Sequence, residues 1–164
     1  MRPSITCFSM AVLVMLSQAS SAQQVRDTVE LQVAALRYAR ETIARNRVLA
    51  VDTTSVIDFK QGRHARLTDS AIVGALGASA RRGASSDLIV CTTPRDYKSC
   101  SIANADIVVT LAFPTFRGDS AFFPIRVQAR QNARWPISET TQVLRFVKKG
   151  GAWVFASAAR RSVT

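Results

Sequence analysis

The clearest pattern of hydrophobic and polar positions lies in the C-terminal part of the chain, where apolar side chains recur at every second residue. A period of two places successive side chains on opposite faces of a β-strand. Short segments rich in glycine and charge separate the runs, as tight hairpin turns require. The pattern predicts a four-stranded antiparallel meander, with strands over residues 107–113, 121–130, 143–147 and 153–155.

One residue disturbs the second of these runs. Pro124 lies inside the alternating segment and has no N–H to donate to a ladder of hydrogen bonds. We therefore expect this strand to lie at an edge of the sheet or to carry a bulge at Pro124.

The N-terminal region has a helical pattern over residues 27–46. Asp27, followed three residues later by Glu30, resembles a capping box and predicts that the helix begins there. The apolar positions recur at helical spacings and predict one buried face, made of Val29, Val33, Leu36 and Ile43.

The middle of the chain has weaker signals. Residues 47–59 are rich in β-branched side chains and predict one or two short strands, whereas residues 61–66 are polar and predict a loop. A short second helix is expected over residues 68–80, although glycines weaken it. Residues 81–86 have the composition of a basic linker, and residues 88–91 predict a short buried strand.

The first 22 residues have the features of a secretory signal peptide. Arg2 provides the positive start, residues 5–16 form a short apolar core, and Ser20-Ser21-Ala22 is a small-residue cleavage site. A membrane-spanning helix would need about 20 apolar residues, which is more than this core offers. We expect cleavage between Ala22 and Gln23, a secreted or periplasmic location, and a single mature domain over residues 23–164 with no transmembrane segment.

The charge of the chain is strongly basic. It has 22 basic and 11 acidic residues among 164, a net charge of +11. Such a charge attracts anionic partners over long distances. In an exported protein these would be anionic small molecules or components of the cell envelope. Nucleic acid is not expected, because the chain has no recognisable nucleic-acid-binding module. The alternative is a solvated surface with no partner.

Two cysteines, Cys91 and Cys100, remain after removal of the signal peptide, which takes Cys7 with it. An even pair in an oxidising compartment predicts a disulfide bond. The eight residues between them are polar and rich in turn formers, so the bond is expected to close a surface loop. A redox-active pair is the alternative, and it usually has a two-residue spacing.

Residues suited to catalysis are few. His64 is the only histidine and has arginines beside it, and Asp52, Asp58 and Asp106 are the carboxylates closest to strand-like segments. There is no cluster of residues that predicts a metal site, no phosphate-binding loop and no serine-nucleophile motif. No metal or cofactor is therefore expected, and no catalytic residue is assigned.

A candidate ligand site comes instead from arginines on the predicted meander. Arg126 and Arg130 point to the same side of one strand, and Arg145 comes from another. On one face of the sheet, the three could hold a carboxylate or phosphate through forked, charge-assisted hydrogen bonds. The alternative is the ordinary solvent-facing side of a half-buried sheet.

The last predicted hairpin, residues 143–155 with Gly150-Gly151-Ala152-Trp153-Val154-Phe155 at its end, resembles the closing hairpin of the nuclear-transport-factor-2-like superfamily, whose members have a cone fold like that of polyketide cyclases. The resemblance covers residues 25–158, with a motif-level match only in the last two strands. The extended stretch at residues 48–56 and the cysteine loop depart from the usual order. The resemblance implies a pocket between the helices and a curved sheet. The superfamily includes isomerases, cyclases, dehydratases and non-catalytic modules.

Together these features predict an α+β fold, with N-terminal helices packed on a curved, cone-like antiparallel sheet. The first functional hypothesis is a secreted or periplasmic, non-catalytic binding or interaction domain for a small or anionic ligand. The alternative is an isomerase- or dehydratase-like enzyme that uses an aspartate with His64 or a tyrosine. A structural accessory domain that packs against an envelope protein is the third. The oligomeric state stays open.

Overall fold

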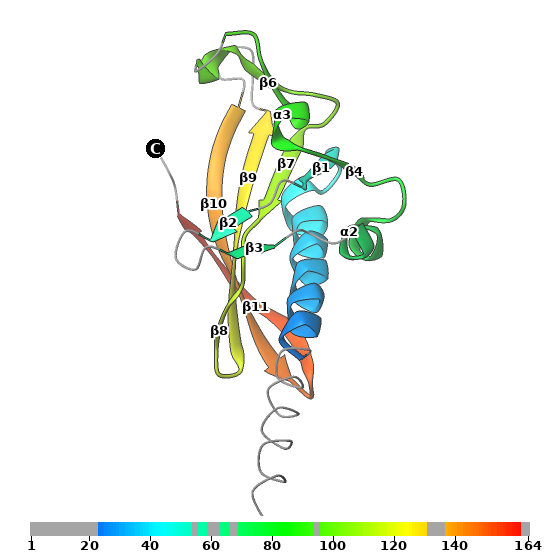
Figure 1. Ribbon diagram of the computed structural model, residues 1–164, viewed down its shortest axis with the longest axis vertical. Coiled ribbons are helices and arrows are strands. Elements are labelled where there is room, and N and C mark those ends of the chain that lie inside the picture. Colours follow the sequence, from blue (N-terminus) through cyan, green and yellow to red (C-terminus); the bar gives the residue numbers. More distant parts are fainter. Residues whose placement is uncertain are drawn as a thin grey trace, which may run out of the picture.

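A computed structural model of the chain has one long helix packed on a large twisted sheet (Figure 1). The expected signal peptide and the expected start of the second helix at residue 68 lie outside the described residues. So do the side chains of Asp58 and His64. The structure describes residues 23–53, 56–58, 63–65, 69–93, 96–130 and 137–161.

The main sheet has seven strands in the order β11-β10-β9-β7-β1-β4, with β8 also paired to β9. The four predicted C-terminal strands are present as an antiparallel meander, and the α+β class is confirmed. At the other end the sheet is parallel, because β1 pairs in parallel with both β7 and β4. The bounds are β1 Leu49–Asp52, β4 Arg81–Gly83, β7 Ile107–Leu111, β8 Thr115–Arg117, β9 Ser120–Arg130, β10 Ile137–Lys149 and β11 Ala152–Arg161.

Pro124 lies in a central strand and not at an edge, because β9 has neighbours on both sides. The predicted irregularity is found in the neighbouring strands. Four residue steps from Leu111 to Thr115 face only three from Ile125 to Phe122, so one extra residue forms a bulge between β7 and β8. The Pro124 carbonyl still accepts a 3.0 Å bond from the Ala112 N–H. The missing N–H of proline therefore falls where the ladder is already interrupted.

Two segments predicted as irregular are strands. Residues 81–86, predicted as a linker, begin with β4 and continue into the short helix α3 (Ser85–Leu88). The predicted loop at residues 61–66 includes β3 (Arg63–Ala65), which pairs with β2 (Val56–Asp58) in a separate two-stranded sheet. The arginine side chains of β4 are exposed and only its backbone pairs with β1. The composition of this polar edge strand therefore resembles that of a linker.

The N-terminal helix is described from residue 23, four residues before its predicted start. Asp27 is therefore not a cap but a buried residue inside the helix. The helix widens into a π-helical turn over Ala39–Ala44 and ends at Arg45, whose φ is 51°. Its buried face also differs from the prediction. Of the four predicted residues only Leu36 is fully buried, and it is joined by Leu31, Ala35 and Ala39.

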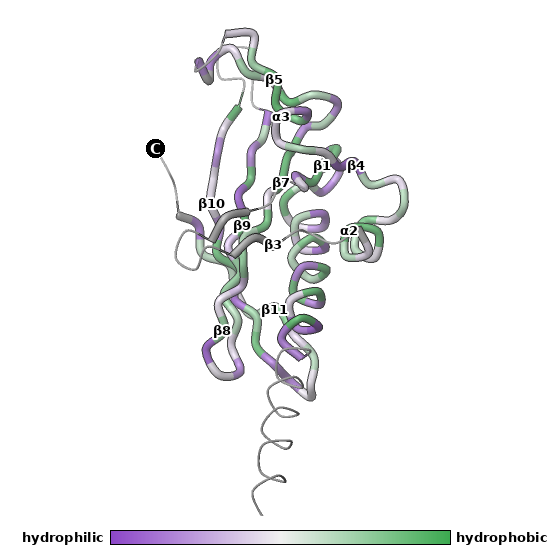
Figure 2. Tube along the Cα trace, viewed as in Figure 1, coloured by the Kyte–Doolittle hydropathy of each residue, from purple (hydrophilic) through white to green (hydrophobic). Residues whose placement is uncertain are grey.

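The small side chains on this face let the helix backbone approach the sheet. Figure 2 shows hydrophobic and hydrophilic residues alternating along the turns of the helix, as is typical of an amphipathic helix lying on a core. The side of the sheet that faces the helix supplies the largest buried residues, among them Phe123, Ile125, Leu144 and Phe146. The second helix, α2 (Asp69–Leu76), adds Ile72 to the same core and ends before Gly77, which has a φ of 88°.

The predicted disulfide between Cys91 and Cys100 is present. The two cysteines face each other across a small two-stranded sheet of β5 (Ile89–Cys91) and β6 (Cys100–Ile102). A short 3₁₀ turn, Tyr97–Ser99, precedes β6. Ile102 and Leu88 pack with Ala50 and Val108 in a second, smaller apolar cluster on the other face of the main sheet. The bond therefore joins two strands of a lobe attached to that face.

An ion pair fixes the N-terminal end of the long helix to the sheet. The Lys148 ammonium group lies 3.0 and 3.1 Å from the two carboxylate oxygens of Asp27, and the Gln23 amide donates to the same carboxylate at 3.0 Å. Burial raises the pKa of Asp27, but the hydrogen bonds from Lys148 and Gln23 lower it more, so the pKa lies below its ordinary value.

We predict that Asp27→Asn lowers the free energy of unfolding by about 1.5–3 kcal/mol at pH 7, because a charge-assisted hydrogen bond is lost and Lys148 keeps its charge. A folded-state pKa below the unfolded one stabilises the native state above about pH 4, and this contribution is lost as pH falls through the folded pKa. Urea denaturation at pH 7 and pH 3 should therefore show a difference between variant and wild type that shrinks at low pH. Asp119→Asn, at an exposed turn, is the control. An Asp27→Asn difference that is equal at both pH values would contradict the ion pair.

Candidate functional site

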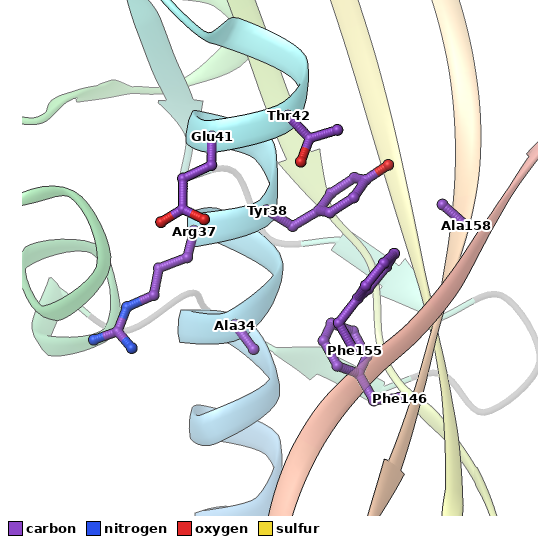
Figure 3. Close-up of a pocket in the computed structure, with 8 residues that line it drawn as sticks. All are labelled: Ala34, Arg37, Tyr38, Glu41, Thr42, Phe146, Phe155 and Ala158. Atoms are coloured by element: carbon purple, nitrogen blue, oxygen red, sulfur yellow. The ribbon is translucent and has the colours of Figure 1, made fainter.

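An open cleft of about 580 Å³ lies between the N-terminal helix and the last two strands of the sheet (Figure 3). Its size falls within the range of small-molecule sites. The helix and the strands β10 and β11 supply its walls, and the lining residues are Ala34, Arg37, Tyr38, Glu41, Thr42, Phe146, Phe155 and Ala158.

Three aromatic rings make the inner surface of this cleft. Phe146 and Phe155 are cross-strand partners on the helix-facing side of β10 and β11, and their rings meet edge to face at 5.9 Å. Tyr38 comes from the helix and stacks on Phe155 at 4.8 Å. Phe146 is fully buried, whereas Phe155 is 42 % exposed. The cleft therefore offers an accessible ring on a rigid aromatic base.

The phase of β11 depends on a bulge. The register between β10 and β11 shifts between Arg145 and Phe146. Phe146 pairs with Phe155 and Arg145 pairs with Ser157, so Ala156 is the extra residue. In a regular strand Phe155 and Ala158, three residues apart, would point to opposite faces of the sheet. With it, both Phe155 and Ala158 line the cleft.

The polar groups of the cleft are few. The Tyr38 hydroxyl lies 3.5 Å from Oε1 of the buried Gln142, at the limit of a hydrogen bond. In Figure 3 the side chains of Arg37 and Glu41 extend away from the aromatic rings. The Arg37 guanidinium donates to the Gly74 carbonyl of α2 at 3.4 Å. The inner surface is thus mainly apolar, and the hydroxyls of Tyr38 and Thr42 are the polar groups that lie beside the rings.

The three arginines predicted as a ligand site lie elsewhere, on the other face of the sheet. Arg126 forms a 3.4 Å ion pair with Glu139. Arg130 donates to the Ile102 carbonyl, and Arg145 lies 3.5 Å from the Ser120 hydroxyl. Arg126 pairs with Thr141 in the next strand, four residues from Arg145, a separation of about 13 Å along a strand. The structure thus puts all three on one face but does not bring them together.

Asp52 and Asp106, two of the acidic residues considered from the sequence, also lie away from the cleft. Asp52 is buried beside β7, where its carboxylate accepts a 3.0 Å hydrogen bond from the Thr110 hydroxyl. Asp106 accepts a 2.9 Å bond from the Val48 N–H and so fixes the start of β1. Among the described residues no three histidine, cysteine, aspartate or glutamate side chains gather as a metal site requires.

A second cleft of about 560 Å³ lies at the opposite edge of the sheet, beside β4. Arg81, Arg82, Asp87 and Asn104 are among its lining residues, so charged and polar side chains form part of its wall. It has no aromatic ring in its lining, and for this reason we take the cleft beside β11 as the candidate site.

Sequence reasoning did not select Tyr38. The predicted buried face of the helix did not include Tyr38. The direction of its side chain depends on how the helix is rotated about its axis, and the residues that are buried in the structure define that rotation. Phe146 and Phe155 were each placed correctly within their strands and pair in the register that the turn at Gly150-Gly151 sets, but the place of Ala158 beside them needs the bulge at Ala156. The alternating pattern alone could not reveal that extra residue.

Comparison with known proteins gives no further assignment. No protein-family model, no curated protein and no solved structure matches the chain. No helix in the part of the chain that the structure describes is long and apolar enough to cross a membrane.

Proposed function

We propose that this protein is an exported, non-catalytic binding domain whose cleft beside β11 holds a small, mainly apolar ligand. The observation that carries the proposal is the exposed ring of Phe155, held between Tyr38 and Phe146 at the inner surface of a ligand-sized cleft. A ring fixed on both sides offers contact area at little cost in side-chain entropy.

Export and fold family form part of the same proposal. A cross-strand disulfide suits an oxidising compartment such as the periplasm or the extracellular space. A helix over a twisted sheet with a cleft between them supports the resemblance to the nuclear-transport-factor-2-like superfamily. The parallel pairing of β1 with β7 departs from a simple antiparallel cone.

A non-catalytic role is favoured by the chemistry of the cleft. Of the eight lining residues, Glu41 is the only carboxylate, and its side chain extends away from the rings (Figure 3). Asp52 and Asp106 hold the framework of the sheet through hydrogen bonds. An enzyme of the alternative kind would need a carboxylate or histidine to act with a tyrosine such as Tyr38, and the described lining offers none directed toward the rings.

We predict that Phe155→Ala weakens binding of the neutral fluorescent probe N-phenyl-1-naphthylamine by about tenfold, because ring contacts and buried apolar area are lost. Val154→Ala is a matched control: Val154 is 43 % exposed, close to the 42 % of Phe155, and is the neighbouring residue in the strand. Fluorescence titration of both variants gives the comparison. Equal affinities for the two variants, or no binding by the wild type, would refute the proposed site.

A further inference from the structure

The outer edge of β11 is a second surface that the proposed cleft does not explain. This strand has ten residues and ends the main sheet, and within the described part of the chain it pairs only with β10. Its side chains from Val154 to Arg160 are all exposed. An edge strand leaves a row of backbone N–H and C=O groups without ladder partners. The natural ligand for such a row is another extended polypeptide.

The side chains along β11 leave room for a further strand. Residues 156–159 are Ala156-Ser157-Ala158-Ala159, so no bulky side chain flanks the backbone there. Proteins usually protect an edge of this length with proline, with a covering segment or with a charged residue in the middle of the strand. In β11 the charged residues, Arg160 and Arg161, are confined to its end, and the bulge at Ala156 interrupts the ladder at one point.

The charge around this edge has one sign. The hairpin of β10 and β11 has no acidic residue from Thr140 onward. Lys149 and Arg145 are exposed on β10 and pair with Ala152 and Ser157 of β11, whose small side chains leave them accessible from the edge. Arg160 is exposed near the other end. A partner strand would therefore meet basic side chains along its whole length.

We propose that the edge of β11 binds an extended, acidic segment of another protein by adding it to the sheet as a further antiparallel or parallel strand. Backbone hydrogen bonds supply the affinity, and Arg145, Lys149 and Arg160 select acidic side chains. Phe155 and Ala158 line the cleft, so the added strand would lie beside the cleft and lengthen its wall. This inference goes beyond the small-molecule site and rests on a different observation, the unpaired edge.

A second copy of this chain fits the edge less well. Antiparallel pairing of two β11 strands would bring Arg160 of one copy toward the residue 149–152 end of the other, where Lys149 is exposed. Like charges facing each other destabilise such pairing. The net charge of +11 opposes self-association further.

The test uses the mature protein and a capped peptide of the same length as β11, with alternating threonine and valine between pairs of aspartates. We expect saturable binding in calorimetry and at least about tenfold slower hydrogen exchange at alternate backbone amides of residues 154–160. The same peptide with an N-methyl group on every residue cannot donate ladder hydrogen bonds from either edge. It should not bind, and this control leaves the protein unchanged.

The charge requirement is tested with Arg145→Glu, which should weaken the acidic peptide by about tenfold and improve binding of its lysine counterpart. Arg81→Glu makes the same charge change on β4, at the opposite edge of the sheet, and should leave both affinities unchanged. Equal effects of the two variants, or equal binding of the N-methylated peptide, would overturn the inference.

Two further outcomes also decide the question. Protection of the β11 amides that rises with protein concentration without peptide would replace the acidic partner with a second copy of the chain. Binding of N-phenyl-1-naphthylamine that persists while the peptide does not bind would leave the proposed cleft standing and refute only the strand addition.

Discussion

Replacing Phe146 with alanine is expected to lower the free energy of unfolding by about 3–5 kcal/mol. The side chain is fully buried in the main core and supports the Phe155 ring from β10. Its removal would leave a cavity between the sheet and the helix. The surrounding backbone cannot close this cavity, because β10 is hydrogen-bonded to β9 on one side and to β11 on the other. Urea denaturation followed by circular dichroism measures the change.

Phe122→Ala is the matched control for this prediction. Phe122 lies on the other face of β9, half-buried, with the Arg117 guanidinium 5.7 Å from its ring centroid. Loss of that contact and of part of the buried area should cost about 1–2 kcal/mol. If Phe122→Ala destabilised the protein as much as Phe146→Ala, the assignment of the helix-facing side as the main core would be wrong.

Removing the disulfide with Cys91→Ser and Cys100→Ser is expected to destabilise the protein by about 2–3 kcal/mol. The bond closes a short loop across β5 and β6, and its loss frees the unfolded chain. The main sheet should persist, because β5 and β6 pair with each other and not with its strands.

The measurement compares urea midpoints of the oxidised wild type, the reduced wild type and the double serine variant. Reduced wild type and variant should have similar midpoints, both below that of the oxidised protein. Peptide mapping without reductant should recover Cys91 linked to Cys100. Identical midpoints for all three proteins would show that the bond does not stabilise the fold.

The sequence predicted best those parts of the fold in which local pattern and global position agree. The strands of the meander alternate because one face meets the helix, and this signal is present in each strand by itself. The strand β4 has no such signal, since Arg81 and Arg82 expose their side chains and only the backbone contacts β1. A parallel pair between segments so far apart in the chain cannot be inferred from either segment alone.

The site was harder to predict than the fold for the same reason. That Arg126 and Arg130 share a face follows from their spacing along one strand, whereas the face of Arg145 depends on the register between β9 and β10. The ion pair of Arg126 with Glu139 depends on the register of the strands. The hydrogen bond from Arg130 to the Ile102 carbonyl depends on the position of the β5–β6 lobe. The cleft depends on three elements at once, because Tyr38 meets Phe155 only after the helix packs on β10 and β11, and Ala158 joins them only through the bulge at Ala156.

If the helix and β11 form the binding site, an added ligand must change the magnetic environment of the residues between them. Amide and side-chain NMR signals of the mature domain would be followed while N-phenyl-1-naphthylamine is added. We predict that the largest shifts fall on Tyr38, Phe155 and Ala158, which line the cleft. Shifts that gather instead on Arg81 and Asn104, at the cleft beside β4, with Tyr38 and Phe155 unchanged, would contradict it.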